Sequence, residues 1–154
     1  MAPNQTFAHN VSKVDLTRYQ GKWYVIACIP TKFDKEWNYV TETYSINKKG
    51  NIDIETTYFE DGSTKQGTVM SKGFPDKDSK NVKWKVQFVW PFKSDYLVEE
   101  LSNDYSHVVV GHPEKKFLYI MNRAGRMSEE TYISLLTSCG KKGYDLTKLR
   151  KVPQ

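Results

Sequence analysis

Eight segments with the pattern of β-strands, most of which alternate apolar and polar residues, run from residue 21 to residue 123 and are joined by short turns. A period of two is typical of β-strands, because successive side chains of a strand point to opposite faces. The predicted strands are residues 21–29, 39–47, 52–60, 64–74, 82–90, 95–101, 105–112 and 116–123. Sequential strands joined by turns rich in Gly, Pro, Asn and Asp favour an up-and-down arrangement. We therefore predict an all-β fold, an eight-stranded antiparallel up-and-down β-barrel, whose interior at this strand number can hold one small ligand.

The first predicted strand, residues 21–29, is mostly apolar on both faces. Such a strand is expected to line a cavity with one face and to be covered by another element on the other. Gly21 permits a sharp turn into the strand, and we expect Trp23 on the inner face as the barrel floor. Cys28 has the opposite parity from Trp23, so we expect it on the outer face.

Two helical segments are expected to flank the barrel. Residues 10–20 indicate a short N-terminal helical turn that plugs one end. A C-terminal α-helix begins after Ser128, a capping residue followed by acidic residues, and ends near Gly140 and Gly143. The spacing i, i+3, i+4, i+7 predicts its buried face, packed outside the barrel: Tyr132, Leu135, Leu136 and Cys139. Residues 144–149 are expected to follow as a short extra strand or an extended strap.

The chain has two cysteines, Cys28 and Cys139, and three histidines. Because Cys28 is expected on the outer face of the first strand and Cys139 on the buried face of the helix, we expect the two to lie close together. They would form either a disulfide or a pair of adjacent free thiols. Neither residue type has the spacing of a zinc site, so no metal and no cofactor is predicted.

Length indicates one domain over residues 1–154, with residues 1–9 as a flexible N-terminal tail. The net charge of +5 is spread over turns and outward strand positions, which indicates a solvated surface and no nucleic-acid binding. Peripheral membrane association stays open, and we expect a monomer or a weak dimer. The start of the chain lacks the pattern of a signal peptide. The expected localisation is outer-membrane, periplasmic or secreted if a leader was trimmed, and otherwise cytoplasmic and membrane-peripheral.

Three short motifs in order resemble those of the lipocalin family: Gly-Lys-Trp-Tyr at residues 21–24, Asn-Asp-Tyr at residues 103–105 and Met-Asn-Arg at residues 121–123. The resemblance spans residues 10–153 and is strongest to the bacterial lipocalins, the plant temperature-induced lipocalins and apolipoprotein D. It implies the lipocalin calyx, with a structural floor formed by Gly21, Trp23 and Arg123. In this floor the arginine is expected to pack over the tryptophan ring, as a cation on a ring face.

The chain departs from the family pattern at a few positions. These relatives usually carry Glu where this chain has Val25, and apolar residues where it has Glu42 and Glu99. The two cysteines do not match the disulfide positions of apolipoprotein D, so those bridges cannot be carried over. Ligand preference is the property that these departures affect most directly.

The resemblance implies binding and transport or storage of a small hydrophobic ligand, such as a fatty acid, a lysophospholipid or a related lipid. Burial of an apolar chain would drive binding, and we expect no enzymatic activity. The expected ligand-binding residues are Glu42, Tyr44, Thr56, Tyr58, Trp84, Val86, Phe88, Trp90, Leu97 and Glu99. Alternation places Glu42 on the inner face, whereas the resemblance to apolipoprotein D places Thr56 and Glu99 there. Two alternatives stay open: a lipid-modifying enzyme on the same barrel, and a lipocalin that binds a pigment or cofactor.

Overall fold

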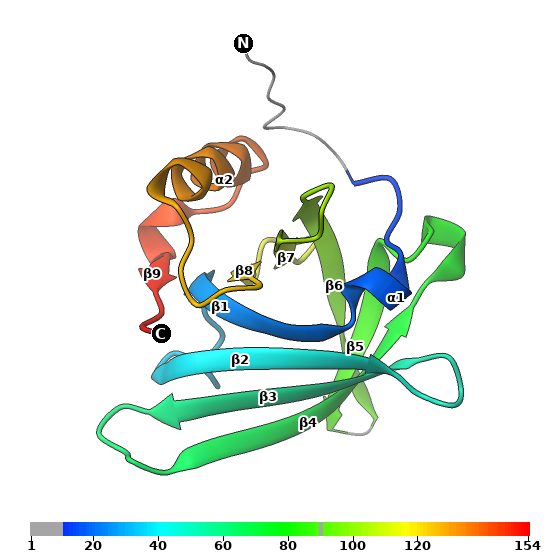
Figure 1. Ribbon diagram of the computed structural model, residues 1–154, viewed down its shortest axis with the longest axis horizontal. Helices are drawn as coiled ribbons and strands as arrows, with labels where there is room; N and C mark the ends of the chain where they lie inside the picture. Colours follow the sequence, from blue (N-terminus) through cyan, green and yellow to red (C-terminus); the bar gives the residue numbers. More distant parts are fainter. Residues whose placement is uncertain (1–10, 90) are drawn as a thin grey trace.

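The computed structural model describes residues 11–89 and 91–154, so the tail predicted for residues 1–9 lies outside it. Nine strands form one antiparallel sheet within these residues: β1 (Gly21–Ile29), β2 (Trp37–Ile46), β3 (Ile52–Glu60), β4 (Gln66–Pro75), β5 (Lys83–Val89), β6 (Phe92–Leu101), β7 (His107–Gly111), β8 (Leu118–Asn122) and β9 (Arg150–Lys151). Consecutive strands pair from β2 through to β8, and β1 pairs with both β8 and β2, which closes the sheet (Figure 1). The predicted eight-stranded antiparallel barrel is confirmed, with β9 as an additional short strand.

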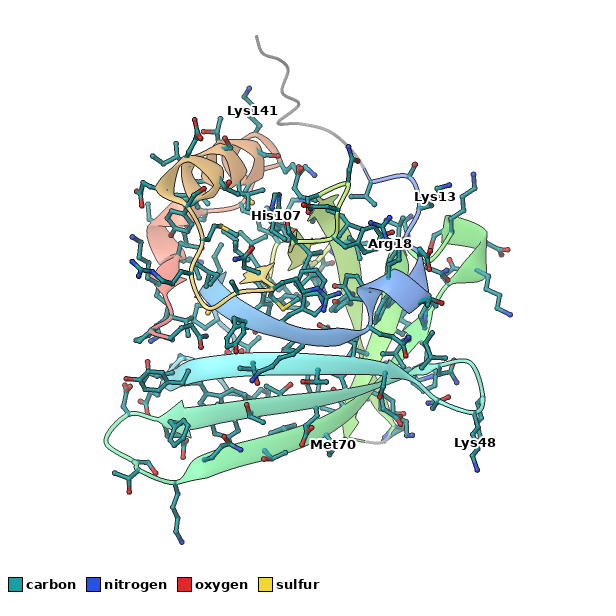
Figure 2. All side chains as sticks on the ribbon, in the orientation of Figure 1. Lys13, Arg18, Lys48, Met70, His107 and Lys141 are labelled. Carbon is teal, nitrogen blue, oxygen red and sulfur yellow. The ribbon has the colours of Figure 1, made fainter. Side chains whose placement is uncertain are left out.

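Alternation along the strands separates an inner from an outer face. In β3 and β4, Ile54, Thr56 and Ser71 are buried on the inner face, whereas Met70 lies on the outer face and is 57% exposed (Figure 2). Apolar residues of the inner face form one core cluster inside the barrel. A second core cluster lies between the outer face of β1, β7 and β8 and the C-terminal helix.

Helices α1 (Leu16–Tyr19) and α2 (Glu129–Lys141) flank the barrel as predicted. The Asp15 carboxylate caps α1 by accepting from two backbone N–H groups, and the Ser128 hydroxyl caps α2 by accepting from the Thr131 N–H. Figure 1 shows α2 outside the barrel and α1 at the end where β1 begins. The chain also has two 3₁₀ turns, η1 (Lys77–Ser79) and η2 (Leu146–Lys148). Within the residues that the structure describes, no helix is long and apolar enough to cross a membrane.

The C-terminal residues fill a gap in the barrel wall. β1 pairs with β2 only along residues 21–24 of β1. Further along, β1 pairs with β9 in place of β2. The side-chain amide of Gln154 donates to the carbonyls of Val25 and Val40, and so links the two strands where they have separated. The segment predicted at residues 144–149 therefore takes a different form, a 3₁₀ turn followed by β9.

A β-bulge in β1 overturns the prediction for the cysteines. Between Val25 and Ala27 the register to β8 shifts by one residue, so side chains beyond the bulge point to the face opposite to the predicted one. Cys28 therefore belongs to the core inside the barrel, whereas Cys139 belongs to the core beneath α2. Both thiols are free and buried, which contradicts the disulfide alternative. The two cysteines lie in different cores on opposite faces of the barrel wall, and not together beneath the helix as predicted.

Candidate ligand-binding site inside the barrel

The two ends of the barrel are closed differently. Because the strands are antiparallel, the connections β1–β2, β3–β4, β5–β6 and β7–β8 lie together at one end, which we call the mouth. The helix α1 lies at the opposite end, where β1 begins (Figure 1). Its residue Tyr19 is fully buried and accepts a hydrogen bond at its carbonyl from the Trp23 indole N–H, at 3.0 Å.

Trp23 has no exposed surface and forms the floor. The guanidinium carbon of Arg123 lies 3.7 Å from the centroid of the Trp23 ring, and the same guanidinium donates to three backbone carbonyl groups. Gly21 has a φ of 103°, and a Cβ at this position would lie 3.1 Å from Arg123 Nη1. Any other residue at Gly21 would strain the backbone and displace the arginine. These contacts seal the closed end.

Five aromatic side chains fill the floor half of the interior: Tyr19, Trp23, Tyr44, Trp84 and Tyr96. Their neighbouring ring centroids lie 4.7 to 6.0 Å apart, within the range of favourable aromatic pairs. Each of the five is at most 6% exposed. The floor half is therefore packed with side chains.

A chain of hydroxyl groups crosses this aromatic layer and ends at Glu42. The Tyr44 hydroxyl donates to Glu42 Oε1 at 2.5 Å and lies 3.0 Å from the Tyr96 hydroxyl, which lies 2.6 Å from the Tyr19 hydroxyl. Because Tyr44 gives its proton to Glu42, it accepts from Tyr96, which in turn accepts from Tyr19. All three hydroxyls are thus ordered toward one carboxylate oxygen.

Glu42 is an interior carboxylate whose hydrogen-bond donor is a neutral tyrosine. Burial raises its pKa above the ordinary value, although the hydrogen bond from Tyr44 acts in the opposite direction. Burial likewise raises the pKa values of Tyr19, Tyr44 and Tyr96, which stay neutral at physiological pH. Across residues 11–89 and 91–154, no Lys, Arg or His nitrogen lies within 4.0 Å of the Glu42 carboxylate.

The mouth half of the interior is accessible, in contrast to the floor half. Four inward-facing side chains there keep part of their surface exposed: Trp37, Glu42, Tyr58 and Tyr119. The Trp37 and Tyr58 rings stack with centroids 3.6 Å apart and 6° between their planes, and Tyr58 covers Gly67, where a Cβ would come within 2.3 Å of its ring. Inward side chains can stay accessible only if a space lies between them. Partial exposure of these residues distinguishes the mouth half from the packed floor half.

Asp34 ties the β1–β2 loop to the barrel. Its carboxylate accepts from the Thr31 backbone N–H at 2.7 Å and also from the Tyr119 hydroxyl of β8. Burial and the charge of Asp34 raise the pKa of Tyr119 well above its usual value. Arg150 of β9 donates to the Trp37 carbonyl at 2.8 Å and so fixes the start of β2.

Six of the predicted ligand-binding residues face the interior: Glu42, Tyr44, Thr56, Tyr58, Trp84 and Val86. Thr56 pairs with Glu42 across β2 and β3, so the two side chains are neighbours on the inner face. Phe88, near the mouth, is 60% exposed. Trp90 lies outside the residues that the structure describes.

The inward placement predicted for Leu97 and Glu99 is wrong. Tyr96 and Val98 belong to the interior cluster, so Leu97 between them points outward. Glu99 has the same outward parity as Leu97, and its Oε1 lies 3.6 Å from Lys142 Nζ on the outer side. A β-bulge after Val98 turns the next residue, Glu100, outward as well. Both faces of this strand are apolar in sequence, so alternation alone could not choose between them.

Several residues of the interior are not among the predicted ligand-binding residues. Trp37 lies outside the predicted strand 39–47, although it begins β2. Tyr19 and Tyr96, which are 77 residues apart, meet only because the barrel closes over α1. The one sequence feature that could have indicated the inward position of Tyr96 is the apolar face that it shares with Val98.

Comparison with known proteins gives consistent matches. A family model described as the lipocalin-like domain matches residues 14–154. Temperature-induced lipocalin-1 of Arabidopsis thaliana is 33% identical over 153 residues, covering 94% of this chain and 81% of the relative. Outer membrane lipoprotein Blc of Escherichia coli K12 is 31% identical over 148 residues, with the same coverage.

Among solved structures, insecticyanin from the tobacco hornworm Manduca sexta matches with a TM-score of 0.73 and 15% identity, over 99% of this chain and 85% of that chain. At this identity the likeness concerns the fold alone. The family model and the relatives agree with the three motifs and with the barrel, its N-terminal turn and its outer helix. The chain therefore belongs to the lipocalin family, whose barrels bind small hydrophobic molecules.

Proposed function

We propose that this protein binds and carries a single-chain lipid, of the general kind to which fatty acids and lysophospholipids belong, in the mouth half of the barrel. One observation carries the proposal: Trp37, Glu42 and Tyr58 face inward and stay accessible above a floor sealed by aromatic side chains. Such a space binds an alkyl chain by removing it from water. Each buried methylene contributes about 0.8 kcal/mol, or up to about 9 kcal/mol for a 12-carbon chain before the costs of association.

The proposed contacts divide into apolar and polar ones. Trp37, Tyr58, Val86 and Phe88 are proposed to contact the alkyl chain, since they surround the accessible half of the interior or its rim. Glu42 and its neighbour Thr56 are proposed to contact the polar end. Tyr44 and Trp84, packed in the floor, would support the site from below.

A thiol-dependent lipid-modifying enzyme is the main alternative, and Cys28 would be its nucleophile because it faces the interior. A nucleophilic thiol needs a lowered pKa. Burial and the charge of Asp34 instead raise the pKa of Cys28 to about 12. This supports a carrier, in keeping with a family that generally binds rather than converts its ligands. A pigment-binding lipocalin would be coloured as purified.

Exposed apolar side chains at the mouth support ligand exchange at a membrane surface. Phe33, Phe88 and Phe92 are 86%, 60% and 75% exposed. Lys32 and Lys35 flank Phe33 in the β1–β2 loop and are exposed as well. Aromatic and basic side chains together suit an anionic lipid interface, and one relative is named an outer membrane lipoprotein. We propose transient contact between the mouth and a membrane.

The carrier proposal is tested with N-phenyl-1-naphthylamine, a neutral apolar fluorophore whose binding does not depend on ligand charge. We expect saturable enhancement of its emission and displacement by single-chain lipids. Native mass spectrometry after incubation with a lipid extract should show the chain with one unmodified lipid. Failure of both the fluorophore and the extract to bind would refute the carrier function.

A further inference from the structure

We propose that this site selects single-chain lipids whose polar end donates hydrogen bonds, and that a long-chain ammonium or hydroxyl end binds inward against Glu42. This inference rests on the carrier function proposed above. It concerns the direction in which the ligand lies and the chemistry of the end that enters first.

Glu42 lies deep in the interior, next to the floor. Glu42 pairs with Trp23 on β1 and with Thr56 on β3, so it lies directly above the sealed floor. It nevertheless keeps accessible surface, which the floor residues lack. A chain that enters through the mouth and fills the accessible half therefore brings its leading end to this carboxylate.

The hydrogen bonds around Glu42 leave one oxygen available. Oε1 accepts from the Tyr44 hydroxyl at 2.5 Å. No donor within the described residues reaches Oε2 in hydrogen-bonding geometry. The Tyr44 proton is committed to Glu42, so the site presents acceptors to an entering ligand. An ammonium or a hydroxyl group complements this arrangement, whereas a carboxylate does not.

The charges around Glu42 also favour an ammonium or hydroxyl end over a carboxylate. The other carboxylate facing this space is Asp34, held by Thr31 and Tyr119 above it. Two guanidinium groups at the ends of the interior are occupied elsewhere. Arg123 lies against Trp23, and Arg150 donates to the Trp37 carbonyl and to the Asn38 side-chain amide oxygen. A fatty-acid carboxylate would be a third anion in a space without a free cation among the described side chains. A ligand ammonium would supply the missing positive charge, and the aromatic rings around it add to the attraction.

The affinities for ammonium and carboxylate ligands should depend on pH in opposite directions. Burial raises the pKa of Glu42, so acidification neutralises it more readily than an exposed glutamate. An ammonium ligand needs the ionised form, and its affinity should rise with pH through the Glu42 titration. A carboxylate ligand needs the protonated form and should bind more tightly as the pH falls. Tyr19, Tyr44, Tyr96 and Tyr119 have raised pKa values, as does Cys28, so these groups remain neutral across the titration.

The test uses three probes with the same alkyl chain: dodecylamine, 1-dodecanol and dodecanoic acid. Each displaces N-phenyl-1-naphthylamine from the wild-type protein, from Glu42→Gln and from two control variants. Glu55→Gln removes an exposed carboxylate on the outer face of the adjacent strand. Asp34→Asn removes the other interior carboxylate. The pH dependence of the three affinities is measured on the wild-type protein, so this part of the test does not depend on whether a variant folds.

Near neutral pH we expect dodecylamine to bind at least about tenfold more tightly than dodecanoic acid, the effect of one charge-assisted hydrogen bond. The two affinities should move in opposite directions with pH. Glu42→Gln should weaken dodecylamine binding about tenfold and flatten both profiles, with dodecanol changed by less than about threefold. Glu55→Gln should leave all three affinities unchanged, and Asp34→Asn should preserve their order.

Equal affinities for the amine and the acid, or an order that Glu42→Gln leaves intact, would overturn the inference while the carrier function stands. A pH profile that Asp34→Asn abolishes and Glu42→Gln does not would overturn it as well, because the polar end would then face the mouth. If none of the probes and not even the neutral fluorophore binds, the carrier function itself fails.

Discussion

Replacing Lys142 with methionine should destabilise the packing of α2 on the barrel. Lys142 Nζ lies 3.0 Å from Glu100 Oε2 and 3.6 Å from Glu99 Oε1, and it donates to the Glu99 backbone carbonyl at 2.5 Å. The exposed fractions of these side chains are 12% for the lysine and 13% and 11% for the glutamates, so water screens the cluster little. The variant leaves two adjacent carboxylates without their cation.

Removing one partner of a buried ion pair costs about 3–5 kcal/mol, because the remaining charge stays uncompensated. For a chain of this size each kcal/mol lowers Tm by about 2–4 °C, which gives a loss of about 6–20 °C. Differential scanning calorimetry and urea unfolding measure it directly. The matched control is Lys141→Met, since Lys141 is exposed at the end of the same helix and points away from it (Figure 2). This control should change stability by no more than about 0.5 kcal/mol.

The double variant Lys142→Met with Glu99→Gln separates charge from packing. If uncompensated charge causes the loss, removing one carboxylate should recover part of it. A loss for Lys142→Met below about 1 kcal/mol would mean that the cluster behaves as a solvated surface pair. A double variant no more stable than the single one would equally refute the reasoning.

Two further predictions concern the floor and the thiols. Arg123→Leu should lower the free energy of unfolding by about 2–4 kcal/mol, because it removes the cation from the Trp23 ring and hydrogen bonds from backbone carbonyl groups. Urea unfolding should show a larger loss of stability for this variant than for Arg126→Leu, which changes an exposed arginine. Cys28 and Cys139 should both count as free thiols in denaturant, and in the native protein they should react slowly at neutral pH and faster as the pH approaches their pKa of about 12. A disulfide found by non-reducing peptide mapping would contradict this.

The strand pattern predicted the barrel because most of the eight segments alternate and short turns join them, and alternation within residues 39–47 predicted the inward face of Glu42. Between Thr41 and Ile46 the pairing of β2 with β3 has no interruption, so local parity holds. In β1 and β6 a bulge inserts one extra residue, near Ile26 and at Glu99. A bulge is defined by the pairing with the neighbouring strand, which the local sequence does not record. The same alternation rule therefore placed Glu42 correctly and Cys28 on the wrong face, whereas the inward placement of Glu99 came from the resemblance to apolipoprotein D and was wrong.

The polar network of the interior could not be predicted from local patterns. Tyr19 comes from a four-residue helix, Tyr44 from β2 and Tyr96 from β6. In sequence each is an aromatic residue of an apolar face, and only closure of the barrel brings the three hydroxyls into a line. Buried hydroxyl groups need partners, so a cluster of inward tyrosines implies a polar acceptor among them. Glu42 is that acceptor.

The hydroxyl chain also explains how the floor can stay packed while Glu42 changes charge. When Glu42 is ionised, Tyr19 donates to Tyr96, Tyr96 to Tyr44 and Tyr44 to the carboxylate. A protonated Glu42 can instead donate to Tyr44, and each hydroxyl then donates in the opposite direction through the same oxygen atoms, since every hydroxyl is both a donor and an acceptor. No ring has to move in this reversal. Under the inference proposed above, titration of Glu42 would change which polar end the site accepts, while the aromatic packing beneath it keeps the barrel folded.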